Sequence, residues 1–223
     1  MKYLFIRSAL LILFVCIPFS LVASDSEWTF LMEKDGLKLY SGDTENSAFK
    51  TFRAVKEFDI PMEVIAEALK DFSNYKNWIP DFMENNLIKN LNENDPTASD
   101  YILHILFNAP WPVKNRDVVL VVRTKINWEK MHARVVLKST NLFDVPLKKG
   151  VRRLKVFKGT YDLQYMNRNR TRVTYTSFSD PGGHLSPMMT YRVQKKLPYN
   201  TLMGLARVAK EKKYYTRAMK NYN

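Results

Sequence analysis

Several residue types are scarce in this chain of 223 residues, and each scarcity excludes a class of protein. The single cysteine, Cys16, excludes a disulfide-built scaffold and any zinc or redox site that needs paired cysteines. The three histidines, His104, His132 and His184, lie far apart and do not show the spacing of metal ligands. Glycine-rich phosphate loops and Gly-x-Ser-x-Gly nucleophile turns are also absent. We therefore expect no metal, no cofactor and no catalytic residue.

Apolar and aromatic residues, by contrast, are plentiful. Hydrophobic residues make up 46% of the chain and aromatic residues 13%, which is typical of a globular protein and not of a disordered one. A chain of this length buries enough surface to hold a core without a metal or a disulfide. Neither internal repeats nor a low-complexity linker interrupt it. We predict one domain over residues 25–223.

Residues 1–24 have the layout of a secretory signal peptide. Lys2 and Arg7 precede an apolar run, and the small residues Ala23 and Ser24 mark a cleavage site before the first acidic residue. An uncleaved membrane anchor is the alternative, but the apolar run is shorter than the roughly 20 residues that span a bilayer. Lipid attachment at the cysteine is disfavoured by the large residues before it. We expect export to the periplasm or outside the cell, with the protein free or peripheral on a membrane.

The positive charge is concentrated in the last third of the chain. The formal net charge is +13, and residues 148–223 hold 18 Lys and Arg against 3 Asp and Glu. One interpretation is a solvated face. The other is attraction to anionic lipid headgroups, at about 1 kcal/mol per well-placed cation. Nucleic acid is disfavoured by export and by the lack of aromatic residues spaced for base stacking. We predict that the basic residues after 147 bind an anionic membrane surface, and that the protein is a monomer.

Periodicity predicts an α+β fold. Apolar residues at three- and four-residue spacing predict a helix over 62–72, and a second helical stretch over 186–217 should be broken at Pro198. Asp35-Gly36 is a hairpin signal, Trp78 anchors a turn, and the apolar phase shifts at Gly159, which predicts a bulge or bend. The predicted strands cover 28–34, 37–41, 49–58, 87–91, 99–107, 117–127, 131–139, 151–166 and 170–178.

Two motifs stand out from this pattern. Residues 109–117 read APWPVKNRD, and the two prolines predict an extended, rigid crossing between strands. Residues 179–183 read SDPGG, a turn before the last helical stretch, in which Asp180 is expected to be a turn or cap residue. In this order and spacing, and with the WIPD segment at residues 78–81, the motifs resemble the lipid-transfer START family, including its bacterial members. The resemblance covers about residues 27–215.

The resemblance implies a helix-grip fold, in which a curved antiparallel β-sheet wraps around a long C-terminal helix. An internal hydrophobic cavity of that fold takes one lipid, sterol or similar apolar molecule, which the protein would bind and transfer between membranes. The broader helix-grip superfamily also includes aromatases, cyclases and hydrolases, so an enzyme acting on an apolar metabolite is the alternative. A plain interaction module with a filled interior is a further one.

Arg116 is the sharpest candidate for a ligand contact. In relatives that bind phosphatidylcholine, the arginine of the Asn-Arg-Asp motif contacts the lipid phosphate, a task that suits a guanidinium. The competing interpretation is a buried ion pair, for example with Asp117. Those relatives also carry a tyrosine where this chain has Ala109, so the headgroup site differs and another apolar ligand stays open.

Alternation along the strands and the last helix nominates the other lining residues, although ordinary core packing is the alternative for each. Tyr101 and Tyr175 are also candidates for a hydrogen bond to a ligand hydroxyl or carbonyl. His184 could line the mouth of the tunnel. The candidate ligand-binding residues besides Arg116 are Tyr101, Leu103, Phe107, Trp111, Tyr175, Met188, Met189, Leu202 and Leu205, with Ile105, Val119, Val121 and Met203 as further lining candidates.

Overall fold

The computed structural model describes residues 28–91, 98–183 and 185–222, and ten strands within them form one sheet. The order across the sheet is β1-β2-β3-β10-β9-β7-β6-β5-β4, with antiparallel neighbours throughout, and the short β8 pairs in parallel with the start of β6. The strands are β1 Thr29–Lys34, β2 Leu37–Gly42, β3 Thr51–Phe58, β4 Phe82–Asn90, β5 Ala98–Phe107, β6 Asn115–Asn127, β7 His132–Ser139, β8 Val151–Arg153, β9 Val156–Asn167 and β10 Arg170–Asp180.

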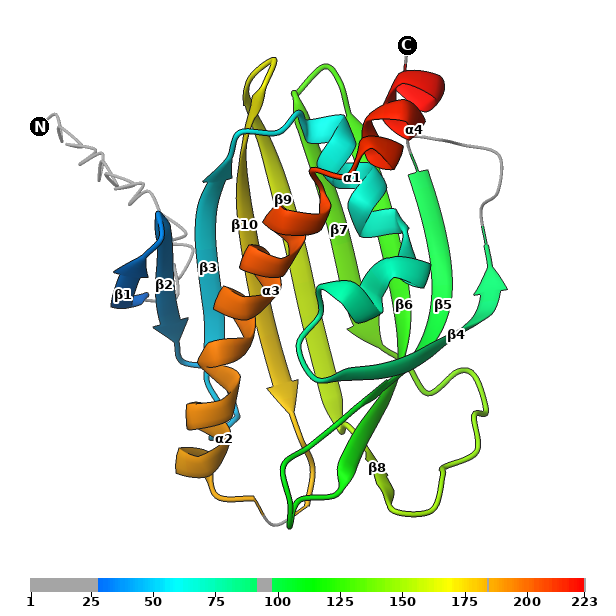
Figure 1. Ribbon diagram of the computed structural model, residues 1–223. Coiled ribbons are helices and arrows are strands. Elements are labelled where there is room, and N and C mark those ends of the chain that lie inside the picture. Colours follow the sequence, from blue (N-terminus) through cyan, green and yellow to red (C-terminus); the bar gives the residue numbers. More distant parts are fainter. Residues whose placement is uncertain (1–27, 92–97, 184, 223) are drawn as a thin grey trace, which may run out of the picture.

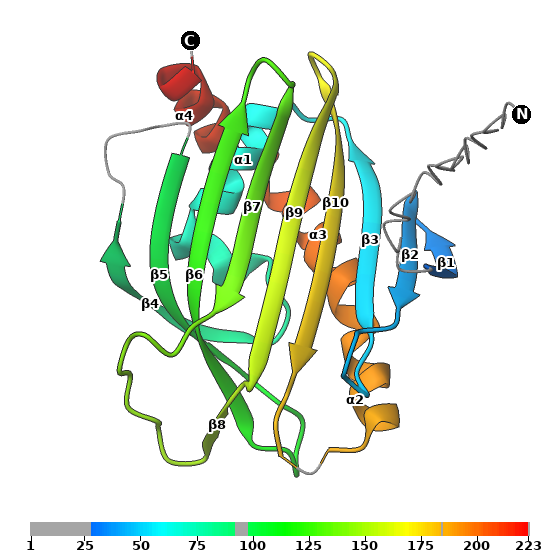
Figure 2. The same cartoon turned by 180° about the vertical axis from the view of Figure 1, so that it is seen from behind.

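The helices all lie on one face of this curved sheet, and the opposite face is left without a helical layer (Figures 1 and 2). The helix α3 runs along the concave face, where its buried Leu202 and Leu205 join the same apolar core as the sheet. The α+β fold with a sheet wrapped around a C-terminal helix is therefore confirmed. The helical elements are α1 Met62–Lys70, the 3-10 helix η1 Phe72–Asn77, α2 Pro187–Gln194, α3 Lys196–Val208 and α4 Lys212–Tyr222.

The first half of the chain follows its local signals closely. Asp35 and Gly36 both adopt positive φ angles, 52° and 69°, as a two-residue hairpin turn between β1 and β2 requires. In α1 the apolar face is buried against the sheet, and the helix begins directly after Pro61 as predicted. It ends at Lys70, two residues before the predicted end, and η1 then leads to the buried Trp78.

The faces of β5 and β6 are fixed by their antiparallel register. Leu103 and Ile105 pair with Leu120 and Val118, and all four belong to the core beneath the helices. His104 pairs with Val119, so both side chains lie on the opposite face of the sheet. The same alternation places Val121 on that face, and the prediction that Val119 and Val121 line an interior cavity is wrong.

Gly159 does not form the predicted bulge. The strand β9 pairs with both β7 and β10 through Gly159 without a change of register, and the chain breaks earlier, at Leu154-Lys155. A Cβ at Gly159 would lie 3.1 Å from the ring of Phe157. The glycine therefore leaves space for that ring along the strand.

The C-terminal stretch is divided into three helices, not two. Lys195 separates α2 from α3, so Pro198 lies in the first turn of α3, where a missing N–H costs nothing because that turn has no intrahelical acceptor. A second break at residues 209–211, which the periodicity did not predict, begins α4. That last helix packs on α1 through the buried Tyr214 and Ala218.

Among the described residues, no helix is long and apolar enough to cross a membrane. The predicted signal peptide at residues 1–24 lies outside the described residues, as does His184.

Candidate functional site

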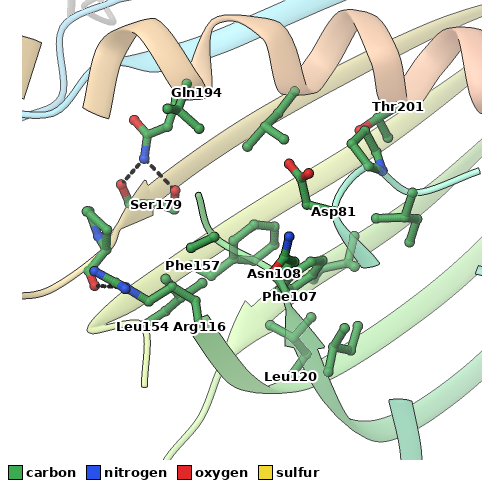
Figure 3. Close-up of a pocket in the computed structure, with 18 of the residues that line it drawn as sticks. Asp81, Phe107, Asn108, Arg116, Leu120, Leu154, Phe157, Ser179, Gln194 and Thr201 are labelled. Carbon is green, nitrogen blue, oxygen red and sulfur yellow. Dashed lines mark hydrogen bonds between the residues drawn. The ribbon is translucent and has the colours of Figure 1, made fainter. Parts of the chain in front are cut away.

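A cavity of about 270 Å³ lies between the concave face of the sheet and the helices α2 and α3. One water molecule needs only about 10–15 Å³ measured in this way, so the space is large enough for part of an organic ligand. Apolar side chains make up most of its wall, with a few polar groups among them (Figure 3). The lining is Leu69, Tyr75, Trp78, Ile79, Pro80, Asp81, Ile105, Phe107, Asn108, Ala109, Pro110, Val113, Arg116, Leu120, Val135, Leu137, Leu154, Phe157, Tyr161, Tyr175, Ser179, Pro181, Leu185, Met189, Thr190, Val193, Gln194, Leu197 and Thr201.

The cavity opens to solvent between α2 and the loop that joins β5 to β6. Asn108 and Pro110 from that loop are exposed and line the cavity, as do Met189 and Val193 from α2. The loop is not the extended crossing that its prolines predicted, because the Val113 N–H donates to the Pro110 carbonyl and closes a turn. We call this opening the mouth.

The two sequence motifs meet beside the mouth. Arg116 Nε donates a hydrogen bond of 2.9 Å to the carbonyl of Pro181, 65 residues later in the chain. Asp180 acts as the predicted turn residue, because its carboxylate accepts the Gly182 N–H at 2.9 Å. Gly182 and Gly183 both have positive φ, and a Cβ at Gly183 would meet the guanidinium of Arg152 at 2.9 Å. The glycine pair therefore lets the backbone turn closely against a second arginine.

Arg116 has no carboxylate partner among the described residues. Its second contact is also to a carbonyl, that of Lys114. Partial burial and the positive charge of Arg152 lower the pKa of the Arg116 guanidinium, which nevertheless stays protonated at neutral pH. The mouth of an apolar cavity thus holds a cation whose charge is not neutralised by any carboxylate of the described residues.

Asp117, the suggested partner of Arg116, lies on the other face of β6. Its carboxylate accepts from His104 Nε2 at 2.9 Å and from Arg153 Nη2 at 2.7 Å. Burial raises the pKa of the Asp117 carboxyl, but the hydrogen bonds from Arg153 and His104 outweigh it, and the net pKa is lowered. The competing interpretation, an Arg116–Asp117 ion pair, is wrong, because successive residues of a strand point to opposite faces.

Two buried polar atoms in the cavity wall have no hydrogen-bond partner among the described residues: the Thr190 hydroxyl and the Trp78 indole nitrogen. Thr190 is 6% exposed and Trp78 4%. Next to Thr190 on the same helix, Gln194 is already satisfied, since its amide donates to the Ser179 carbonyl and hydroxyl at 2.8 and 2.6 Å (Figure 3). Unpaired buried polar groups are costly, and the two free atoms are suited to hydrogen-bond a ligand or a trapped water.

The inner end of the cavity is aromatic. The rings of Tyr161 and Tyr175 stack with centroids 4.3 Å apart, and burial raises the pKa of both hydroxyls. Tyr75 lies nearby and donates its hydroxyl to the Leu69 carbonyl at 2.9 Å. These groups stay neutral at physiological pH and provide an apolar wall with few free hydrogen bonds.

The structure brings four of the ten predicted ligand-binding residues to the cavity wall: Arg116, Phe107, Tyr175 and Met189. The other six are not in the lining. Leu103, Leu202 and Leu205 are fully buried in the core, and Tyr101 packs edge-on against Phe72. Trp111 is 92% exposed and Met188 points away on the outer side of α2. Of the further candidates, Ile105 lines the cavity and Met203 does not.

Sequence reasoning missed several polar groups of the wall, above all Asp81, Thr190 and Thr201. Asp81 was available from the sequence as part of the WIPD segment, but its direction depends on its positive φ of 56°. Among the described residues, no group of three His, Cys, Asp or Glu side chains is placed to hold a metal ion.

A curved antiparallel sheet that encloses an apolar cavity under a C-terminal helix, with a cation at the mouth, defines the helix-grip class of ligand-binding proteins. The sequence profile of the START domain matches residues 20–208, and the chain belongs to the START domain family.

Similar proteins and solved structures are consistent with membership of this family. The chain is 29% identical over 186 residues to an uncharacterized protein of Pseudomonas aeruginosa, covering 83% of this chain and 88% of that one. It is 26% identical over 167 residues to the phosphatidylcholine transfer protein of Bos taurus, covering 73% and 74%. The crystal structure of a STAR-related lipid transfer protein from Xanthomonas axonopodis shares the fold, with a TM-score of 0.72, 23% identity and coverage of 82% and 99%.

Proposed function

We propose that this protein binds one phospholipid in its cavity, with the lipid phosphate at Arg116. The observation that carries the proposal is the unneutralised guanidinium at the mouth of an otherwise apolar cavity. A planar guanidinium forms strong paired hydrogen bonds to phosphate oxygens. The acyl chains would lie along the apolar wall, where the burial of each CH₂ contributes about 0.8 kcal/mol. The name of the bovine relative, a phosphatidylcholine transfer protein, supports a phospholipid cargo.

Two further polar groups support the same orientation of the lipid. Thr190 and Trp78 both line the cavity, and each carries a buried donor without a hydrogen-bond partner among the described residues. The ester carbonyls of a phospholipid lie between phosphate and acyl chains, which is where donors in the wall would meet them. Binding would therefore satisfy groups that are otherwise costly to bury.

The test compares uptake of phospholipid by Arg116→Ala with uptake by the unaltered protein. Purified protein is incubated with phospholipid vesicles, re-isolated, and analysed by native mass spectrometry. We expect one lipid per chain, and at least a tenfold lower loading in the variant, since a hydrogen bond to a charged group contributes about 1.5–3 kcal/mol.

Arg123→Ala is the matched control, because Arg123 lies on the same strand, is exposed on the other face and pairs with Asp100 at 3.3 Å. Its loading should equal that of the unaltered protein. Equal loading of a folded Arg116→Ala variant would refute the role of Arg116, and turnover of the lipid into a product would favour the enzyme alternative.

We also propose that the protein transfers its lipid by docking the mouth on an anionic membrane. Exposed apolar side chains lie on three separate segments, with Trp111 on the β5–β6 loop, Leu142 and Leu147 on the β7–β8 loop and Met188 on α2. Figure 1 shows these three segments at the same end of the molecule as the mouth. We call these four residues the apolar rim. Lys114, Lys149 and Arg192 lie on the same segments and Arg152 on the adjoining β8, and none of the four forms an ion pair with a described residue. Tryptophan with neighbouring cations is the side-chain combination that suits a lipid headgroup layer.

Export through residues 1–24, to the periplasm or the cell exterior, remains our proposal for location, as does a monomeric state. The supporting observation is the sequence layout described above, with a positive start, an apolar run and small residues before the first carboxylate. N-terminal sequencing of the protein from fractionated cells would test it. An intact N-terminus on protein from the cytoplasmic fraction would contradict export.

A further inference from the structure

The wall of the cavity carries a negative charge as well as a positive one. Asp81 lines the cavity, and its carboxylate forms no hydrogen bond or ion pair with any described residue. In the view of Figure 3 it points into the hollow between the side chains of Asn108 and Thr201. The Asp81 side chain is exposed at the mouth, so its charge is open to solvent and to a cationic group of a ligand that enters there.

The position of Asp81 is held by the backbone and not by its side chain. Its carbonyl accepts the Asn108 N–H at 2.7 Å, and its φ of 56° turns the chain from the buried Trp78 segment into β4. Aspartate and asparagine both tolerate this left-handed conformation better than most residues. The turn therefore does not need the negative charge, and the charge is available for another purpose.

Asp81 directly precedes β4 and Arg116 lies on β6, so β5 separates them at the same level of the sheet. Phe82, the next residue after Asp81, pairs with Phe107 on β5, and Phe107 pairs with Arg116 on β6. Two strand spacings, or roughly 10 Å, separate the backbones. In Figure 3 the Arg116 guanidinium is turned toward the Pro181 carbonyl, on the side away from Asp81. A zwitterionic headgroup that extends from Arg116 across β5 to Asp81 would contact both charges.

We propose that Asp81 binds the ammonium group of an aminophospholipid whose phosphate lies at Arg116, so that the preferred cargo carries a protonated amine. This inference rests on the proposed function. A carboxylate recognises an ammonium through its N–H donors, and the oxygens of Asn108 and Thr201 are further acceptors for them. A trimethylammonium group has no N–H to donate, and a glycerol headgroup has no positive charge.

The experiment uses vesicles that contain equal amounts of phosphatidylethanolamine, its N-methyl and N,N-dimethyl forms, phosphatidylcholine and phosphatidylglycerol, all with the same acyl chains. The lipids that the full chain extracts are quantified by native mass spectrometry. We expect uptake to fall with each added methyl group, to a total of roughly tenfold between the ethanolamine and choline lipids. Equal uptake across the methylation series would overturn the inference. This experiment uses the unaltered protein alone and needs no variant.

Asp81→Asn removes the charge and keeps the size and the left-handed backbone preference of the side chain. We expect this variant to take up the ethanolamine and choline lipids in nearly equal amounts. The matched control is Glu129→Gln, which removes a negative charge from the exposed turn between β6 and β7 and should keep the preference. An unchanged preference in Asp81→Asn overturns the role of Asp81. Failure of the unaltered protein to take up any phospholipid overturns the proposed function together with this inference.

Discussion

Arg116 and Asp117 are adjacent in the sequence and have opposite electrostatic environments. Arg116 faces the cavity with only carbonyl partners, whereas Asp117 lies on the back of the sheet with two cationic or hydrogen-bonding partners. Arg153 also donates to the Val145 carbonyl at 3.0 Å, so the Asp117 cluster ties the loop between β7 and β8 to the sheet. One residue of the pair is therefore suited to ligand binding and the other to holding the fold.

The Asp117 cluster should make folding stability depend on pH in the acid range. The pKa of Asp117 is lowered in the folded state, so its contribution is present above the unfolded pKa, near 4, and is lost as the pH falls through the folded pKa. Asp117→Asn should lower the free energy of unfolding at pH 7 by about 3 kcal/mol, since it leaves Arg153 and His104 without their carboxylate. Urea unfolding between pH 7 and pH 3 measures both effects.

Asp117→Asn should also reduce the fall in the free energy of unfolding as the pH drops from 7 to 3. Asp162→Asn is the control, because Asp162 is only partly buried and pairs with Arg134 on the sheet surface. Its cost should stay below about 1 kcal/mol. If Asp117→Asn unfolds at the same urea concentration as the unaltered protein at pH 7, the cluster does not stabilise the fold.

The sequence could identify Arg116 but not its surroundings. The Asn-Arg-Asp motif singled out the residue, whereas the absence of a partner depends on which face of β6 it occupies and on which loop carbonyls lie opposite. Thr190 and Asp81 were missed for the same reason. A threonine in a helix and an aspartate after a proline have ordinary local explanations, and only the assembled wall shows that both face a cavity.

At the scale of elements, α3 approaches the Trp78 segment so closely that only a glycine fits between them. A Cβ at Gly204 would lie 2.3 Å from the Trp78 carbonyl oxygen and 3.1 Å from two other backbone atoms of that residue. Gly204→Ala should therefore destabilise the protein. The clash costs about 3 kcal/mol, which exceeds the roughly 1 kcal/mol that alanine contributes to a helix interior. Thermal or urea unfolding would measure the net loss of about 2 kcal/mol.

Gly42→Ala is the companion measurement, because a Cβ there would meet the Trp28 ring at an ordinary 3.4 Å. We expect its stability to be unchanged or slightly raised. A Gly204→Ala variant as stable as the unaltered protein would mean that α3 can shift away from the Trp78 segment at little cost. The position of α3 over the cavity would then be variable.

Local patterns predicted most strands correctly and failed where a residue serves a distant partner. The Asp35-Gly36 turn, α1 and the strands from β5 to β7 follow from periodicity and turn chemistry. Gly159 was interpreted as a bend, but it makes room for the Phe157 ring in the cavity wall. Pro198 was interpreted as the site of the break, but it lies inside the first turn of α3. Packing between segments that are distant in the sequence decides the role of such residues. A single sequence does not show which segments pack together.

At the scale of the whole molecule, the positive charge after residue 147 is divided between two ends. Several of these residues form ion pairs far from the mouth: Arg170 and Arg172 share Glu57, and Lys213 and Arg217 share Asp71. Others lie on α2, on β8 and in the loop before β8, among them Arg192, Arg152 and Lys149, and Figure 1 shows these segments at the mouth end. The concentration of charge along the sequence thus does not form a single basic face.

This division predicts which part of the protein binds a membrane and how salt affects it. Binding to vesicles of anionic lipid should weaken as salt rises, because the Debye length falls from about 10 Å at 0.1 M to about 3 Å at 1 M.

Trp111→Ala should weaken binding about tenfold at every salt concentration, since the exposed indole contributes through apolar contact and not through charge. Trp128→Ala removes an indole from the opposite end, where it packs on Tyr222, and should leave vesicle binding unchanged. Vesicle sedimentation measures all three proteins, and equal binding by the two tryptophan variants would show that the mouth end is not the docking surface.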